Sequence, residues 1–241
     1  MTQAQIPGPD RARAARERLI VALDFQDAAT ALAMVDRLGE DVTWYKVGME
    51  IFYAEGRVLL DALRGRGKRV FLDLKLHDIP NTMAMALRSL SRLPVELCTM
   101  HISAGPEALR ACAVEVRRIA ETGGPAIGLL GVTRLTSLSP PDSSDPWRDV
   151  VSLAGQAVAC GIYGWIAPSA AAPLLRGAHG SGPALVCPGI RLPEQAKQDQ
   201  VAVGTPEEAL RGGADWIVVG RPITRADDPP GAAREIVRRL V

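Results

Sequence analysis

Two aspartates and two lysines stand where three short apolar runs of the sequence end. Asp24 follows LIVAL, Lys46 lies in TWYKVG, and Asp73 and Lys75 lie in VFLDLKLHD. Because residues i and i+2 of a strand share a face, Asp73 and Lys75 are predicted to point together. A fixed ammonium group among carboxylates can stabilise developing negative charge and donate a proton. The alternative is a set of ion pairs that only stabilises the fold, but buried charges rarely add stability.

Two further motifs are typical of phosphate binding. The sequence PGIR ends at Arg191, and the sequence GRPIT begins with Gly220 and Arg221. Glycine lets the backbone approach an anion closely, and a guanidinium group supplies a forked pair of donors that matches phosphate oxygens. GRPIT alone could be a turn with a solvated arginine, whereas two such motifs after neighbouring strands favour a phosphate site.

Short apolar runs alternate with amphipathic segments along the chain. Eight strands, each followed by a helix, predict a parallel sheet, and eight such units close a barrel with its active site at the carboxyl ends of the strands. Thr205, Pro206 and Glu208 predict a capping box at the start of one helix. The predicted strands span 19–23, 43–47, 69–74, 95–100, 126–130, 163–167, 184–187 and 216–219. The predicted helices lie near 28–38, 57–65, 80–92, 105–121, 147–160, 169–176, 206–212 and 231–240.

The predicted fold class is therefore α/β, a single-domain (β/α)8 TIM barrel. The barrel is expected to span residues 19–241, after an N-terminal leader or helical arm over residues 1–18. A doubly wound open sheet is the alternative, but the first strand is not followed by the GxGxxG motif of its dinucleotide-binding forms. No linker-like stretch divides the chain, and residues 139–146 are predicted to form a long loop after the fifth strand.

Composition argues against several classes of partner. Lys and Arg number 28 against 27 Asp and Glu, so no net field favours nucleic acid or anionic lipid. No stretch reaches the roughly 18 apolar residues of a membrane span. The four cysteines are scattered without metal-binding spacing and are expected to be buried thiols in a cytoplasmic protein. No histidine pairs with another at ligand spacing, so we expect no metal site.

Together these motifs resemble those of the orotidine 5′-phosphate decarboxylase family over nearly the whole chain. The matching segments are LIVALD (19–24), YKVGME (45–50), FLDLKLHDIPNT (71–82), LTS (135–137), PGIR (188–191), DQ (199–200) and IVVGRPIT (217–224). The resemblance implies a carbon–carbon lyase that converts orotidine 5′-phosphate to UMP in pyrimidine biosynthesis. It also implies that the enzyme needs no cofactor and acts as a homodimer.

The resemblance further implies a role for each matching residue. Lys75 would protonate C6 of the pyrimidine, and Asp73 would lie beside the substrate carboxylate and hold Lys75. Asp24 and Lys46 would bind ribose hydroxyls and complete the catalytic network. The other substrate-binding positions would be Ile79, Thr136 at the base, Pro188, Arg191, Gln200 on a loop that closes over the ligand, Gly220 and Arg221.

Two of the implied positions would serve the neighbouring subunit. Asp78 and Thr82 would reach into the partner's site, so that Asp78 would be catalytic only in the dimer. The sequence departs from the family pattern elsewhere. Val201-Ala202 follow DQ where a basic residue is common in the family, which leaves the charge of the closing loop open. The predicted strand at 95–100 ends in MHISAG, where the family more usually has an HAxGG-type sequence, so His101 is assigned no catalytic role.

Loss of CO2 from C6 would leave a carbanion with no carbonyl placed to accept the charge simply, so electrostatic stabilisation by a fixed ammonium is expected. Three alternatives stay open. A metal-dependent sugar-phosphate decarboxylase or synthase of the same barrel class would need a divalent metal and a carboxylate in the strand predicted at 43–47, where this chain has Lys46. A Schiff-base aldolase would use Lys75 as a neutral nucleophile, which the flanking carboxylates oppose. A non-catalytic nucleotide-phosphate sensor would not require the chemical residues, all of which are present.

Overall fold

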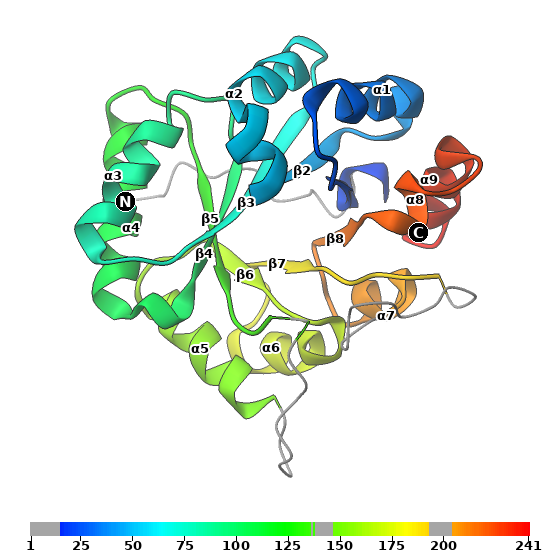
Figure 1. The fold of residues 1–241 in the computed structure, drawn as a ribbon. Coiled ribbons are helices and arrows are strands. Elements are labelled where there is room, and N and C mark those ends of the chain that lie inside the picture. Colours follow the sequence, from blue (N-terminus) through cyan, green and yellow to red (C-terminus); the bar gives the residue numbers. More distant parts are fainter. Residues whose placement is uncertain (1–14, 136, 138–146, 193–203) are drawn as a thin grey trace.

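The computed structural model of the protein describes residues 15–135, 137, 147–192 and 204–241. Its eight strands are parallel and form a closed barrel in the order β1 to β8, surrounded by helices (Figure 1). Closure is made by β1 and β8, which pair Leu19 with Ile217. The predicted TIM barrel is therefore confirmed, and the doubly wound open sheet is excluded.

The strands are β1 Leu19–Leu23, β2 Trp44–Gly48, β3 Arg69–Leu76, β4 Leu97–His101, β5 Gly128–Val132, β6 Gly164–Ile166, β7 Ala184–Cys187 and β8 Trp216–Val219. The α-helices are α1 Ala28–Leu38, α2 Met49–Gly65, α3 Pro80–Leu90, α4 Pro106–Glu121, α5 Arg148–Ala159, α6 Ala172–His179, α7 Pro206–Arg211, α8 Arg221–Thr224 and α9 Pro229–Arg238. The described residues also form the 3-10 helices η1 Ala15–Arg18, η2 Gly39–Asp41, η3 Ile102–Ala104 and η4 Ser169–Ala171.

Alternation along the strands divides the apolar side chains into two layers. In β1, Ile20 and Ala22 belong to the cluster inside the barrel, whereas Leu19, Val21 and Leu23 pack against the surrounding helices. The same parity holds around the barrel, because successive residues of a strand point to opposite faces. Polar residues that follow an inward-facing apolar residue by two positions are therefore directed to the inside of the barrel mouth.

The amino-terminal end of the barrel is filled by large side chains. The rings of Trp44 and Trp216 meet edge to face with centroids 6.0 Å apart. The Arg69 guanidinium lies 4.0 Å from the centroid of the Trp44 ring and also pairs with Glu96. Because these side chains come from the first residues of their strands or just before them, they close the end of the barrel opposite the charged strand ends.

Most predicted helix positions are confirmed, and α2 is the clearest exception. The sequence predicted a helix near 57–65, but α2 begins at Met49 and is kinked at Glu55, where φ is −145° and ψ is 26°. At the kink, the Glu55 carboxylate accepts a hydrogen bond of 2.7 Å from the Ala28 N–H at the start of α1, a tertiary contact that helps to hold Glu55 in place. The predicted capping box is confirmed, with Thr205 and Glu208 each bonded to the other's backbone.

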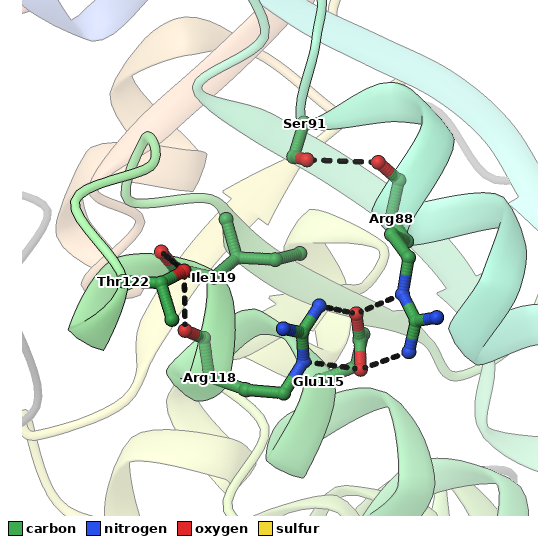
Figure 2. A network of polar contacts seen from close by, with 6 residues as sticks. All are labelled: Arg88, Ser91, Glu115, Arg118, Ile119 and Thr122. Carbon is green, nitrogen blue, oxygen red and sulfur yellow. Dashed lines mark hydrogen bonds and ion pairs between the residues drawn. The ribbon is translucent and has the colours of Figure 1, made fainter.

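Helices α3 and α4 are joined by a clamp of three charged residues, Arg88, Glu115 and Arg118 (Figure 2). The Glu115 carboxylate accepts hydrogen bonds from Arg88 Nε at 2.9 Å and Nη2 at 3.2 Å. It also accepts bonds from Arg118 Nε at 3.1 Å and Nη2 at 2.7 Å. Glu115 is buried, and the two guanidinium groups lower its pKa to about 2. Four charge-assisted hydrogen bonds thus hold one carboxylate between two helices.

The cysteines of the chain lie in its interior. Cys98, Cys112, Cys160 and Cys187 are all buried free thiols, as predicted. Within the described ranges, no helix is both long enough and apolar enough to span a bilayer. The predicted leader at 1–18 falls mostly outside the described residues, which begin at Ala15, the first residue of η1. The predicted loop at 139–146 lies wholly outside them.

Candidate active site

A cavity of about 520 Å³ opens at the carboxyl ends of the strands. Its volume lies within the roughly 300–1,000 Å³ of sites for small organic ligands. Eight of the predicted site residues line it, and they lie at the ends of β1, β2, β3, β7 and β8 or directly after them. They are Asp24, Lys46, Asp73, Lys75, Pro188, Arg191, Gly220 and Arg221. The sequence motifs found on separate strands therefore meet in one cavity.

The two aspartates and two lysines form an alternating network along one wall of this cavity. Lys46 Nζ lies 2.8 Å from Asp24 Oδ1 and 3.8 Å from Asp73 Oδ2. Lys75 Nζ lies 2.8 Å from the same Asp73 oxygen. Asp73 is thus shared by both lysines, whereas the Asp24 side chain is 63% exposed and free to contact a ligand.

Burial of the network makes its charge balance important. Burial alone would raise the pKa of Asp73, but Lys46 and Lys75 outweigh it and lower that pKa. Burial would likewise lower the pKa of Lys46, yet Asp73 and Asp24 raise it above its ordinary value. Asp73 and Lys46 are therefore held in their charged forms, because each is the other's counter-charge. The network carries no net charge, so it offers a ligand fixed positive and negative groups side by side.

Lys75 has an unusual backbone. Its φ of 49° makes it the only non-glycine residue with positive φ in the described part of the chain. The register of β3 against β4 shifts between Leu72 and Leu76, on either side of Lys75. Such bulges redirect side chains and are common beside active sites. The predicted common face of Asp73 and Lys75 is confirmed, but it depends on this bulge as well as on alternation.

The chain after β7 and β8 builds another part of the cavity wall, next to Asp24, because β8 pairs with β1. Gly189 has a φ of 75°, a conformation that favours glycine and turns the chain toward Arg191. Arg191 is 8% exposed, and its Nη1 donates a 3.0 Å hydrogen bond to the Ile190 carbonyl. Gly220 precedes the one-turn helix α8, in which Arg221 is the first residue. Two guanidinium groups and two glycines therefore line this part of the cavity, a combination that suits an anion.

Three predicted residues do not line the cavity of their own chain. Asp78, Ile79 and Thr82 lie on the turn after β3 and on the first turn of α3, where their side chains are exposed. Asp78 Oδ1 accepts a 2.7 Å hydrogen bond from the Ile79 N–H. Two further predicted residues, Thr136 and Gln200, lie outside the described residues.

The cavity also contains residues that the sequence did not single out. The charged ones are Arg134, after β5, and Arg225, after α8. Arg134 directly precedes the Leu-Thr-Ser motif in VTRLTS, and this position could have identified it as a candidate site residue. The remaining lining residues are Ala22, Phe25, Phe71, Val132, Leu135, Ile166, Gly189, Val218 and Thr224.

Histidines lie near Lys75 but outside the cavity lining. The rings of His77 and His101 meet edge to face with centroids 5.3 Å apart, and His77 Nε2 is 3.3 Å from Ser103 Oγ. Burial, with His77 and Lys75 nearby, lowers the pKa of His101. In the described ranges, no three or more His, Cys, Asp or Glu side chains are grouped as metal ligands would be.

Comparison with known proteins agrees with this arrangement. The sequence profile of the orotidine 5′-phosphate decarboxylase / HUMPS family matches residues 17–236. The orotidine 5′-phosphate decarboxylase of Rhodopseudomonas palustris (strain BisA53) is 45% identical over 233 residues, which cover 94% of this chain and 96% of that protein. The corresponding protein of Pseudomonas aeruginosa (strain LESB58) is 40% identical over 94% of this chain and 99% of its own.

A solved structure shows the same fold. The crystal structure of orotidine 5′-phosphate decarboxylase from Lactobacillus acidophilus superposes with a TM-score of 0.78 at 33% sequence identity. The match covers 92% of this chain and 98% of that one. The likeness therefore extends over most of this chain.

Proposed function

The chain belongs to the orotidine 5′-phosphate decarboxylase / HUMPS family and is a carbon–carbon lyase. On this basis we propose that it converts orotidine 5′-phosphate to UMP and CO2, with Lys75 as the proton donor. The observation that carries the proposal is the Asp24–Lys46–Asp73–Lys75 network, which faces the same cavity as the arginines after β7 and β8. The reaction would serve pyrimidine biosynthesis.

The two sides of the cavity suit the two ends of this substrate. Arg191 and Arg221 carry two positive charges, which match a phosphate dianion. Asp24 and Lys46, on the adjoining strands β1 and β2, would bind the ribose hydroxyls. The orotate ring would then lie over Asp73 and Lys75 at the end of β3. Contacts with the remote phosphate would supply binding energy that is used at the reacting carbon.

The proposed step breaks the bond between C6 and the carboxylate. CO2 leaves, the electron pair stays on C6, and the Lys75 ammonium donates its proton there, after which Lys75 takes a proton from solvent. Asp73 would hold Lys75, because their side chains are 2.8 Å apart, and would disfavour the substrate carboxylate by repulsion. The ammonium supplies both the stabilising charge and the proton, so we propose that no metal or organic cofactor takes part.

We propose that the enzyme is a homodimer in which Asp78 and Thr82 complete the neighbouring site, with Ile79 beside them. Their exposure outside the cavity of their own chain supports this proposal. So does the apolar surface on the segments that follow β2 and β3, where Met49, Tyr53, Ile79 and Met85 are 46%, 74%, 65% and 50% exposed. Large exposed apolar side chains of this kind mark interaction surfaces when they gather in one region.

The proposed location is the cytoplasm. Its support is that all four cysteines are buried thiols without a disulfide, which suits a reducing compartment. Thr136 and Gln200 are proposed contacts to the base and the phosphate by resemblance alone, since they lie outside the described residues.

The direct test of the proposed function is turnover of orotidine 5′-phosphate, followed by its loss of ultraviolet absorbance. UMP and CO2 are expected in equal amounts, and the rate is expected to be unchanged by EDTA. A rate that EDTA abolishes would favour the metal-dependent sugar-phosphate chemistry of the same barrel class. Trapping of a Lys75 adduct by borohydride would favour a Schiff base instead.

A further inference from the structure

A buried threonine of β4 stands opposite the bulge in β3. The two strands pair Leu72 with Cys98 and next pair Leu76 with Met100. Between these two pairs β3 has three residues, 73–75, whereas β4 has only one, Thr99. Thr99 therefore lies opposite the bulge. Its side chain is fully buried and follows the inward-facing side chains of β4.

The Thr99 hydroxyl makes two hydrogen bonds to the bulge. The Lys75 N–H donates to Thr99 Oγ1 at 2.8 Å, and Thr99 Oγ1 donates to Asp73 Oδ1 at 2.9 Å. The directions are fixed, because the amide can only donate and an ionised carboxylate can only accept. One hydroxyl therefore holds the backbone of the proposed proton donor and the carboxylate beside it.

This arrangement leaves the other Asp73 oxygen to the lysines. Asp73 Oδ2 is 2.8 Å from Lys75 Nζ and 3.8 Å from Lys46 Nζ, whereas Oδ1 is taken by Thr99. Rotation of the carboxylate would break the Thr99 bond as well as the lysine contacts. Thr99 therefore fixes which oxygen faces the ammonium groups.

The same hydroxyl offsets an unfavourable backbone conformation. A positive φ brings Cβ of an L-residue too close to the backbone, so Lys75 at φ 49° needs surrounding contacts to hold it there. Removal of the hydroxyl would take away the hydrogen-bond acceptor of the Lys75 N–H, and Leu76 is the next residue to pair with β4. Backbone relaxation at this point would move the Lys75 side chain within the cavity.

We propose that Thr99 is a positioning residue for the decarboxylation, which holds Lys75 and Asp73 in their reacting geometry without touching the substrate. This inference rests on the proposed function. Thr99 is expected to influence the chemical step and not the binding of the nucleotide, since the arginines that would hold the phosphate lie on the far side of the cavity, after β7 and β8. A small displacement of a catalytic group costs rate, while ground-state binding through remote contacts is kept.

The test compares Thr99→Val, which keeps the shape and removes the hydroxyl, with Thr99→Ser, which keeps the hydroxyl. The matched control is Thr133→Val. Thr133 is also a buried threonine, directly after the end of β5, and its Oγ1 donates a 2.8 Å hydrogen bond to the Ile166 carbonyl. For each variant, kcat for orotidine 5′-phosphate and the Kd for UMP are measured.

Thr99→Val is expected to lower kcat by about 10- to 100-fold, as for a misplaced catalytic group, while the Kd for UMP changes less than about threefold. Thr99→Ser and Thr133→Val are expected to keep kcat within about threefold of the wild-type value. If Thr99→Val does not fold, Thr99→Cys, with its weak hydrogen bonds, serves in its place with the same expectation.

The pH profile separates positioning from a loss of stability. The groups that face Asp73 are Lys46 on β2, Lys75 on β3, Thr99 and His101 on β4, with Asp24 on β1 joined through Lys46. Removing the Thr99 donor raises the pKa of Asp73, so the acid limb of kcat is expected to move to higher pH in Thr99→Val. Thr133→Val should leave that limb in place.

The outcomes distinguish this inference from the function on which it rests. A wild-type enzyme that does not decarboxylate orotidine 5′-phosphate would refute the proposed function, and the positioning role with it. If the wild-type enzyme is active and Thr99→Val has the same kcat, only the positioning role is refuted. An equal loss in Thr133→Val, or a loss in Thr99→Ser as large as in Thr99→Val, has the same consequence.

Discussion

The clamp at Glu115 allows a quantitative prediction about stability. Replacement of Glu115 by Gln keeps the shape of the side chain but turns one acceptor into a donor. Four guanidinium N–H groups meet the two carboxylate oxygens in the wild-type protein, so the variant places an amide N–H2 against two of those donors. The free energy of unfolding is therefore expected to fall.

The size of the effect comes from the pKa of Glu115. Hydrogen bonds from Arg118 and Arg88 lower this pKa from its ordinary value of 4.5 to about 2, and such a gap corresponds to about 3 kcal/mol. The two arginine side chains are 48% and 49% exposed, so solvent screens part of this energy. We expect a loss of about 1–2 kcal/mol. A domain of this length would lose about 2–8 °C in Tm.

The dependence on pH gives the prediction its sign. A carboxyl group whose pKa is lowered by folding stabilises the protein above its unfolded value, and this contribution is lost as the pH falls through 4.5 toward 2. The difference in Tm between wild type and Glu115→Gln should be largest near neutral pH and shrink below about pH 4. Thermal unfolding monitored by circular dichroism measures both.

A suitable control is Glu121→Gln, which makes the same change of charge at an exposed position of α4. Its Tm is expected to stay within about 1 °C of the wild-type value, as for most surface substitutions. The reasoning would be refuted if Glu115→Gln were as stable as Glu121→Gln near neutral pH. A difference in Tm that did not change with acidification would also refute it.

Two predictions concern the proposed reaction. Arg221→Ala should lower kcat/KM about 10- to 150-fold through loss of a charged hydrogen bond to phosphate. Added inorganic phosphate or phosphite should also increase the turnover of a truncated nucleoside substrate less in this variant than in the wild-type enzyme. An unchanged kcat/KM would contradict the phosphate site. Lys75→Ala and Asp78→Asn should each be inactive alone, whereas mixed dimers should regain activity because one of their two sites receives Lys75 from one subunit and Asp78 from the other. Mixtures that remain inactive after subunit exchange would argue against a shared site.

Much of the barrel could be predicted from the sequence because each strand is a short apolar run with a turn on either side. The predicted segments 19–23, 184–187 and 216–219 coincide with β1, β7 and β8. Predictions were least accurate where a tertiary contact decides the outcome. The start of α2 is such a case, since its kink at Glu55 is stabilised by a bond to α1 that no local pattern in residues 49–56 reveals.

The candidate site shows the same division. The charges on β1, β2 and β3 were predicted to meet because strand alternation and barrel closure are general rules. The bulge at Lys75 was not predicted, because it depends on how two strands pair, and Thr99 was missed with it. A polar residue that follows an inward-facing leucine by two positions, as Thr99 follows Leu97, was the signal that could have identified it.

The central claim is that Lys75 protonates the substrate. The most direct measurement is the turnover of orotidine 5′-phosphate by Lys75→Ala, together with the Kd of the variant for UMP. We expect kcat to fall by more than about 10⁴-fold, because both the proton and the stabilising charge are lost. The Kd for UMP should change by less than about tenfold, since the phosphate contacts are retained. A Lys75→Ala enzyme with kcat within tenfold of the wild-type value would contradict the account.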